Sequence, residues 1–600
     1  MEDSRRVSVL SGFLPWALIL ALVGLDASLR ADRALDRPAF DAGEPASVLQ
    51  SDPAVLARLV GGVLESGGPL PEADRWIEFP NSVEVASTYT VGLEWILLAA
   101  DRATGGAVPL HVLSVWVCSA LAAAAGIGLA LAAWCLTRSP WAALLAAALH
   151  AVLPVTHRTV GFVLVREDLS VPLYALHLAA LVAALGSASR KRWLLAGLTA
   201  GAALATWHGM GVFLLIEGVA LSIVVAWRRT QDPAAWWGSL ALAAMTLLVP
   251  ALLAKGGPLA LAPALVIAVG IVIRWSQTAW VRAALLLAVA VSAMALNPAR
   301  ADMAHVAELL WAKLRYLGVQ PSDPSGLPDS VRMMWQGPFA TVNAANAWRL
   351  FQGGLLALPL VAIGALRGQR QVEALGLFLV LSLPAAWLVQ RVTVLPGLLL
   401  CVLLPVLVSR WATQGRAMLR WGALLALALT QGWMSERQAR AHPTGWLDLE
   451  GARARVALIE AVEERVPRFE PIAADFMLGP LLLARLKHPV PLSPKWESAA
   501  TRERVMRSWM ILYRGSLEEW VEHQRQDLEC RYLLLDERLL LHTPAARWMA
   551  GIPLDGEPAI PGSALEALTA GEIPAPYELL WRREGTQGDL LLLRLRDGGG

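Results

Sequence analysis

The segment HRTVGFVLVREDLSVPLYALH (residues 157–177) joins two long apolar runs and concentrates ionisable side chains just before the second run. These side chains are His157, Arg158, Arg166, Glu167 and Asp168. Charged groups at the mouth of a membrane-spanning helix are costly to place and usually have a function. The two adjacent carboxylates could instead cap the following helix and favour its dipole. Because a neutral cap would have served that purpose, the segment predicts a functional site.

The composition of the chain is that of a membrane protein. Of its 600 residues, 56% are hydrophobic and 17% are charged, and the mean hydropathy is +0.50. Apolar runs near the roughly 20 residues needed to cross a bilayer recur along much of the sequence. The net charge of +2 and the lack of a long basic block argue against a nucleic-acid partner. Four cysteines without a CxxC pair predict neither a zinc site nor a disulfide framework.

Hydropathy and charge together predict the topology. Hydropathy predicts about 13 spans, the first of them retained rather than cleaved as a signal peptide. They are expected at residues 9–29, 109–136, 140–156, 169–188, 193–207, 210–227, 236–254, 258–274, 279–296, 351–366, 371–390, 393–409 and 418–434. With the N-terminus in the cytoplasm, short basic clusters such as 190–192 and 228–229 fall in inner loops. We therefore expect a polytopic α-helical protein of the inner or plasma membrane.

Three large polar pieces are then expected on the extracytoplasmic side, where residues 157–168 also open. They are a first loop of about 30–108, a second loop of about 297–350, and the region 435–600. The chain would thus have a transmembrane domain over residues 1–434 and a small α/β domain over 435–600. Strands of that domain are predicted at PIAADF, HPVPL, RYLLLD and DLLLLRLR.

The two outer loops contain predicted helices. Apolar periodicity predicts helices over residues 51–65 and 304–317. The half-length apolar run 89–100, with Glu94 at its centre, is too short to span a bilayer and predicts an interfacial or re-entrant helix.

The outer loops also carry further candidate site residues. Asp52 stands early in the first loop before Pro53, although Ser-Asp-Pro is also a good helix-opening sequence and could simply cap a helix. The second loop carries His305, Lys313, Arg315 and Arg332. Cationic groups opposite carboxylates suit an anionic substrate such as a lipid phosphate, because they neutralise phosphoryl oxygens as a leaving group departs. A solvated or headgroup-contacting face is the alternative for these four.

Several common catalytic motifs are missing from the sequence. No G-x-x-x-x-G-K-[ST] loop is present, so the sequence contains no nucleotide-binding loop that could drive transport with ATP. Neither a G-x-S-x-G elbow nor an H-E-x-x-H motif occurs.

Taken together, these features resemble the GT-C membrane glycosyltransferases. The resemblance rests on the many spans, the early Asp52 in the first outer loop, the Glu167/Asp168 pair, the long later loop and the outer C-terminal domain. In that superfamily, a sugar passes from a polyprenyl-phosphate or polyprenyl-diphosphate carrier to an acceptor at the outer or lumenal face. In the oligosaccharyltransferase catalytic subunits, an Asp-Pro followed by an Arg looks like Asp52-Pro53 with Arg58. Their WWDYG motif is absent here, so asparagine-sequon activity is not implied.

A second branch, the protein C-mannosyltransferases, is similar in other places. Its Arg-Glu-x-x-Ser-x-Pro pattern resembles residues 166–172, and its threonine-tryptophan segment resembles Thr206-Trp207. In the C-terminal region, PLSPKWESAATRERVMRSWMILYRGSLEEW followed by RYLLLDE resembles its His-Pro-aromatic-Glu, Arg-Glu-Arg, Tyr and Glu-Glu run. The acidic motif that this branch has in its first loop is not present here with the same sequence.

The resemblance implies a transferase that moves a sugar from a polyprenyl-phosphate-linked donor to an extracytoplasmic protein or glycan acceptor. Asp52 would deprotonate or orient the acceptor, and Glu167 and Asp168 would complete the acidic site, with these three carboxylates holding Mg²⁺ or Mn²⁺ if a divalent cation is used. The expected substrate-binding residues are Arg58, His157, Arg158, Arg166, His305, Lys313, Arg315 and Arg332. A membrane transporter or lipid-linked sugar flippase is the alternative. It predicts charges near the bilayer midplane, whereas the charges here gather at one face.

Overall fold

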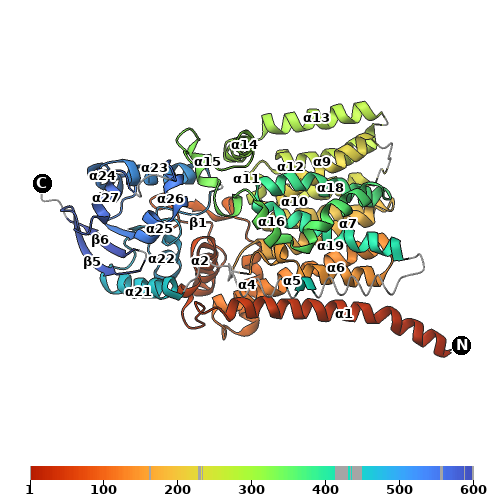
Figure 1. Cartoon of the computed structure of the whole chain (residues 1–600), viewed down its shortest axis with the longest axis horizontal. Coiled ribbons are helices and arrows are strands. Elements are labelled where there is room, and N and C mark those ends of the chain that lie inside the picture. Colours follow the sequence, from red (N-terminus) through yellow and green to blue (C-terminus); the bar gives the residue numbers. More distant parts are fainter. Residues whose placement is uncertain are drawn as a thin grey trace.

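The computed structural model describes residues 2–596, except 161–163, 228–231, 233, 277, 413–429, 433, 435–448, 497, 555–558 and 587. A bundle of long helices forms one part of the molecule, and a smaller part with a β-sheet forms the other (Figure 1). The N-terminus lies at the far end of the bundle, and the C-terminus lies at the far end of the sheet part.

The helices of the bundle coincide with the predicted spans. They are α1 (Glu2–Leu35), α5 (Leu110–Thr137), α6 (Pro140–Val152), α7 (Glu167–Leu185), α8 (Arg190–Thr206), α9 (Met210–Trp227), α10 (Ala235–Leu248), α11 (Pro250–Ala254), α12 (Leu261–Trp275), α13 (Ala279–Leu296), α17 (Gly353–Leu366), α18 (Arg370–Leu388) and α19 (Val394–Ala412). The predicted span 236–254 is divided into α10 and α11, because Pro250 cannot continue the helical hydrogen bonding. The predicted span 418–434 lies mostly outside the described residues.

Helix length alone gives a smaller number of spans than hydropathy. Among the described residues, six helices are long and apolar enough to cross a membrane, and four shorter apolar helices, α6, α9, α10 and α12, accompany them. A seventh span results if α16 (Ala344–Phe351) and α17, which meet at 87°, count as one. The predicted fold class, a polytopic helical membrane protein with a small C-terminal α/β part, is confirmed. Helix length does not establish the predicted number of about 13 membrane spans.

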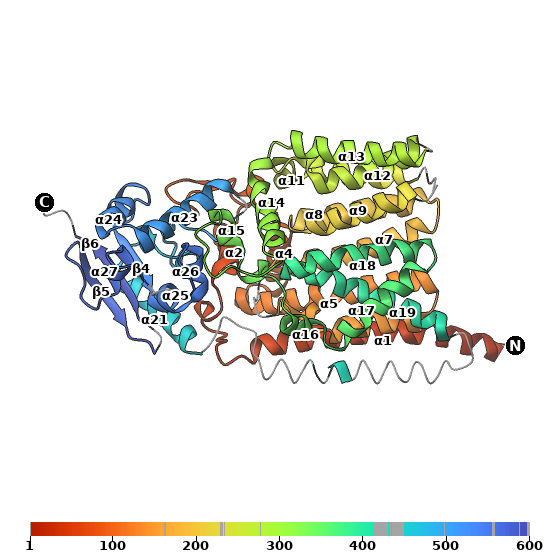
Figure 2. The same cartoon turned by 45° about the horizontal axis from the view of Figure 1, so that its top comes forward.

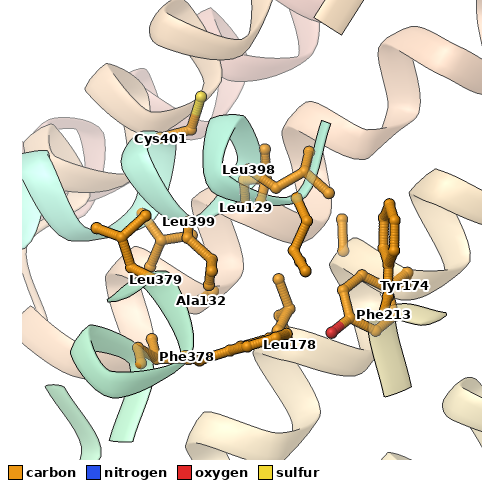
Figure 3. Packing of buried hydrophobic residues seen from close by; sticks show 14 of the residues in the cluster. Leu129, Ala132, Tyr174, Leu178, Phe213, Phe378, Leu379, Leu398, Leu399 and Cys401 are labelled. Carbon is orange, nitrogen blue, oxygen red and sulfur yellow. The ribbon is translucent and has the colours of Figure 1, made fainter. Parts of the chain in front are cut away.

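The centre of the bundle is apolar and closely packed. Figure 3 shows side chains of α5, α7, α9, α18 and α19 meeting there, among them Leu129, Tyr174 and Phe378. Helices α5 and α7 approach closely because Gly128 has no side chain. A Cβ atom at that position would lie 2.6 Å from the carbonyl carbon of Ala175. This contact holds the middle of α7 against α5.

Two polar contacts also hold α7 in place. The Ser170 hydroxyl donates to the carbonyl oxygen of Ala203 in α8, at 2.8 Å. Deeper in the bundle, His177 Nε2 lies 2.9 Å from Oε1 of Glu217 in α9, and the Tyr174 hydroxyl donates to the same carboxylate at 2.8 Å. Buried polar groups that satisfy one another in this way fix helices in a single arrangement.

Shorter elements gather at the end of the bundle that faces the sheet part (Figures 1 and 2). They are η1 (Pro45–Ser47), α2 (Ser51–Ser66), β1 (Ala73–Asp74), β2 (Val83–Glu84), α3 (Val85–Thr88), α4 (Gly92–Thr104), η2 (Pro154–His157), α14 (Arg300–Arg315), α15 (Asp329–Met334), η4 (Gly337–Phe339), α16 and η5 (Gln390–Thr393). The predicted helices at 51–65, 89–100 and 304–317 are therefore present as α2, α4 and α14.

The C-terminal part combines helices with a four-stranded sheet of order β3-β4-β6-β5. Its strands are β3 (Ile472–Ala473), β4 (Tyr532–Asp536), β5 (Tyr577–Arg583) and β6 (Leu590–Leu595), and its helices are α21 (Leu449–Arg465), α22 (Gly479–Leu486), α23 (Ala499–Arg514), α24 (Leu517–Gln526), α25 (Glu537–His542), α26 (Pro544–Met549) and α27 (Ala564–Thr569). Only β3 and β4 run parallel. The predicted strand HPVPL is wrong: Val490 forms a single bridge to Ile77 of the first loop, which ties that loop to the C-terminal part.

Candidate functional site

A cavity lies where the first turn of α7 meets the short helix η5. Its charged wall contains Arg158, Glu167 and Asp168, which the sequence had singled out, together with Arg391 of η5. Apolar side chains complete the wall, including Val171, Phe213, Val394 and Leu398. The cavity thus joins a charged surface to an apolar one.

Glu167 holds two guanidinium groups at this wall. Its Oε1 accepts from Arg158 Nη2 at 3.1 Å, from Arg391 Nε at 2.8 Å and from Arg391 Nη2 at 2.5 Å. The Arg391 guanidinium also lies over the Trp207 ring, 4.7 Å from its centroid. Arg391 is therefore fixed from two sides. Glu167 pairs with both guanidinium groups, and Asp168 lies on the same wall as a second carboxylate.

Asp168 has a different environment from its neighbour. Its Oδ1 accepts a hydrogen bond of 2.5 Å from the Thr159 hydroxyl, and its side chain is buried. Neither carboxylate caps α7, since the residue at the cap position is Arg166 and no side chain makes a capping hydrogen bond. Capping is therefore wrong for both carboxylates, whereas their position in the first turn agrees with the expected favourable interaction with the helix dipole.

Arg166 turns away from this cavity to the half-length helix α4. Its Nε donates to Glu94 Oε1 at 3.2 Å, and its Nη2 contacts the same oxygen. Its guanidinium also lies 5.5 Å from the centroid of the Tyr89 ring. Glu94 is completely buried. This ion pair fastens the loop between α1 and α5 to the residue that precedes Glu167.

His157 is enclosed by α1 and the end of α6. Its Nε2 donates to the carbonyl oxygen of Ala151 at 2.9 Å, and its Nδ1 accepts from Arg33 at 3.1 Å. Burial and the nearby Arg30 hold the pKa of His157 well below its usual range, so the ring is neutral. Both ring nitrogens have protein partners, and its expected binding of substrate stays a prediction.

Asp52 and Arg58 lie on α2. They line neither the cavity at α7 nor a second, smaller cavity that adjoins it beside Asp168. Asp52 Oδ1 lies 2.9 Å from the ammonium nitrogen of Lys495 in the C-terminal part. It does not cap α2, whose cap residue is Gln50, so the capping alternative is wrong here too. Arg58 lies 3.5 Å from Asp74 and stacks over Trp76. The structure thus does not bring Asp52 into the cavity with Glu167 and Asp168.

The cationic residues of the second loop are divided between the interior and the surface. Lys313 is buried, and its ammonium donates to the carbonyl oxygens of Phe339 and Leu388, the latter at 2.6 Å. Its environment is the junction between α14 and the end of α18, and burial lowers its pKa to about 7. His305 of α14 is also buried, whereas Arg315 is exposed and stacks on Tyr316.

Arg332, the fourth of these residues, lies on α15. It is buried, pairs with Asp329 and contacts the Met510 sulfur of α23 at 3.7 Å. None of the four residues lines the cavity at α7. Their role in holding a departing phosphate stays a prediction.

The carboxylates of the predicted metal site are engaged with cations of the protein itself. Glu167 Oε1 lies within 3.1 Å of nitrogens from two guanidinium groups, which would repel a divalent cation at that oxygen. In the part of the chain that the structure describes, no three His, Cys, Asp or Glu side chains converge to hold a metal ion. As placed, these residues do not fit a shared Mg²⁺ or Mn²⁺ ion, and a metal requirement stays an expectation of the resemblance.

Sequence reasoning missed Arg391, although a signal for it existed. Arg391 falls in the two-residue gap between the predicted spans 371–390 and 393–409, and the predicted topology places that gap on the same side as Glu167. A cation at a tight outer turn is a natural partner for carboxylates at the same level.

The bundle, the loop elements at one of its ends and the C-terminal part together form a fold that solved structures share. The chain is similar to the archaeal oligosaccharyltransferase AglB of Archaeoglobus fulgidus. Against its apo crystal structure the TM-score is 0.65 at 13% identity, covering 94% of this chain and 80% of that one. Against its complex with an inhibitory peptide and a dolichol-phosphate, the TM-score is 0.63 at 14% identity, covering 89% and 71%. No family model and no curated protein matches the sequence.

Proposed function

We propose that this protein is a membrane glycosyltransferase that moves a sugar from a polyprenyl-phosphate-linked donor to a protein or glycan acceptor on the extracytoplasmic side. The observation that carries the proposal is the cavity at α7, which combines two guanidinium groups, two carboxylates and an apolar wall. The fold shared with AglB, one structure of which contains a dolichol-phosphate, supports it.

The cavity suits the donor because a polyprenyl phosphate has a charged and an apolar end. Arg158 and Arg391 can hold the phosphate, since guanidinium groups bind phosphoryl oxygens in a planar, bidentate manner. Val171, Phe213 and Leu398 offer an apolar surface to the first isoprene units. Glu167 keeps the two guanidinium groups in place, and Trp207 supports one of them.

Asp168 is the carboxylate best suited to accept a proton. It lines the cavity, and no guanidinium group forms an ion pair with it in the described residues. In the proposed step, an acceptor O–H, N–H or C–H nucleophile forms a bond to C1 of the sugar while the bond from C1 to the phosphate oxygen breaks. The phosphate leaves with the electron pair beside Arg158 and Arg391, and the acceptor proton passes to Asp168.

The test uses the purified protein in liposomes with radiolabelled donors. Dolichyl-phosphate mannose, dolichyl-phosphate glucose and a dolichyl-diphosphate oligosaccharide are each supplied with a glycan or with a peptide that contains Asn-x-Thr and Trp. Transfer of label to an acceptor is expected for one of these pairs. Asp168→Asn should lower the rate by about 10²- to 10⁴-fold, the contribution of a general base.

Asp52→Asn is the matched control, because it makes the same chemical change at the carboxylate that the sequence singled out. It should leave transfer within a few-fold of the wild-type rate. Loss of transfer in Asp52→Asn with an active Asp168→Asn variant would restore Asp52 as the catalytic carboxylate. Label that crosses the bilayer without reaching any acceptor would favour the flippase alternative and contradict the proposal.

A further inference from the structure

A second cavity adjoins the first on the other side of Asp168. It lies between α1, α5 and the segment before α7, with Arg30, Cys118 and Ser119 on its wall. Thr159, Asp168 and Ala122 line both cavities. Asp168 therefore stands at the boundary between the two.

Arg30 is the unusual member of this wall. Its side chain is completely buried at the end of α1. Its Nε donates to Asp26 Oδ1 at 3.0 Å, and its Nη1 donates to the carbonyl oxygen of Thr156 at 2.8 Å. Its third donor group, Nη2, has no hydrogen-bond partner among the described residues. A buried donor without a partner costs roughly 1–3 kcal/mol, which a bound hydrogen-bond acceptor would recover.

The charges around the cavity restrict what that occupant is. Arg30 Nη2 is a hydrogen-bond donor, so it needs an acceptor and a bare cation does not satisfy it, while Asp26 already balances the charge of Arg30 and no anion is needed for that purpose. Asp168 disfavours an anion. A neutral group that both accepts and donates hydrogen bonds satisfies the two together, because it can accept from Arg30 Nη2 and donate to Asp168.

We propose that the second cavity binds the reacting end of the acceptor through a hydroxyl or carboxamide group placed between Arg30 and Asp168. Its assignment to the acceptor rests on the proposed function, whereas the binding of a neutral polar group does not. The two cavities then separate the substrates: the donor phosphate lies beside Arg158 and Arg391, and the acceptor lies beside Arg30. Ser119 adds a hydroxyl to the acceptor side.

Binding is measured first, with small probes and without turnover. Saturation-transfer NMR on the full-length protein in detergent uses ethylene glycol as the hydroxyl probe, acetamide as the carboxamide probe and acetate as the anionic probe. We expect ethylene glycol or acetamide to bind in preference to acetate, and the better of the two identifies the acceptor group. Arg30→Lys keeps a positive charge beside Asp26 but removes Nη2, and should weaken that binding by about 10- to 100-fold.

Two further variants sharpen the binding test. Arg33→Lys makes the same change three residues along α1, where Arg33 contacts His157 and lines neither cavity, and should bind the probe as the wild type does. Ser119→Leu fills the second cavity without touching Arg158 or Arg391 and should abolish probe binding. The proposal is overturned by equal binding in Arg30→Lys and the wild type, by a preference for acetate, or by no probe binding at all. Thermal unfolding midpoints establish that each variant is folded.

Transfer kinetics separate this proposal from the proposed function. Arg30→Lys should raise the KM for the acceptor by about 10- to 100-fold and leave the KM for the lipid-linked donor unchanged. An unchanged acceptor KM with normal turnover contradicts the role of Arg30 but not the proposed function. If the wild type transfers no sugar, the proposed function fails, and the probe measurements alone decide whether the cavity binds a neutral group.

Discussion

Arg166→Met should destabilise the protein strongly, because it leaves Glu94 completely buried without a cationic partner. The pair joins α4 to the residue before α7, so its loss loosens the attachment of the loop between α1 and α5 next to Glu167. Both side chains are almost fully excluded from solvent, with exposures of 5% for Arg166 and 0% for Glu94.

The magnitude follows from this burial. Removing one member of a buried pair costs roughly 3–5 kcal/mol, since the remaining charge is left without compensation. Arg166 also loses its contact with the Tyr89 ring, a cation–π interaction that contributes about 0.5–2 kcal/mol. Removing both charges in the double variant Glu94→Leu/Arg166→Met should recover most of the loss, because no buried charge then remains.

The free energy of unfolding is measured by chemical denaturation in mixed micelles for the single variants Arg166→Met and Glu94→Leu and for the double variant. Arg465→Met is the matched control, since Arg465 pairs with Glu464 at a site where the two side chains are 37% and 67% exposed. It should change the free energy of unfolding by less than about 1 kcal/mol. The reasoning is refuted if Arg166→Met costs no more than Arg465→Met, or if the double variant is as unstable as the sum of the two single variants.

Three other measurements test the environments described above. Arg391→Lys should lower the rate of transfer by about 10- to 100-fold with little loss of stability, because lysine keeps the charge but loses the two-nitrogen donation to Glu167 Oε1 and the stacking on Trp207. Equal rates would exclude a phosphate-holding role for Arg391. Burial lowers the pKa of Lys313 to about 7, below its value of 10.5 when unfolded, so the unfolded chain holds more protons between these values and the free energy of unfolding should rise with pH in that window. Lys313→Met should remove that rise. Burial, with Asp536 nearby, raises the pKa of Asp475 to about 7 from 3.8, so the free energy of unfolding should fall as pH rises between these values. Asp475→Asn should reduce this decrease in the free energy of unfolding with rising pH.

The helices of the bundle were predictable from the sequence because a span must be a continuous apolar run. Apolar periodicity indicated α2 and α14, and a shorter apolar run indicated α4. Strand β5 was missed since its sequence, YELLWRR, mixes charged and apolar residues and its side chains are half-buried. The sharp bend before α17 also escaped prediction, because Gln352 adopts a positive φ of 45° that nothing in its apolar surroundings signals.

The members of the site were partly predictable, but their partners were not. Hydropathy marked Glu167 and Asp168 as costly charges at the start of a span. It did not connect Glu167 with Arg391, which lies 224 residues later, or Arg166 with Glu94, which lies 72 residues earlier. Such pairs are set by how helices pack rather than by local sequence. From the sequence, Asp52 was as good a candidate for a site carboxylate as Glu167. Only the packing shows that the neighbour of Asp52 is Lys495.

The first helix shows most clearly how packing creates the site. In the sequence, residues 9–29 could pass for a signal peptide, and Asp26 and Arg30 lie near its end. In the structure, Asp26 lies 3.5 Å from His150 of α6, and Arg30 bonds to the Thr156 carbonyl and lines the second cavity. Removing α1 would therefore take Asp26 away from His150 and Arg30 away from the Thr156 carbonyl, and would open one wall of the second cavity. The charges near the end of α1 therefore have a structural role: Arg30 holds the segment before α7 through the Thr156 carbonyl, and it lines the second cavity together with Asp168.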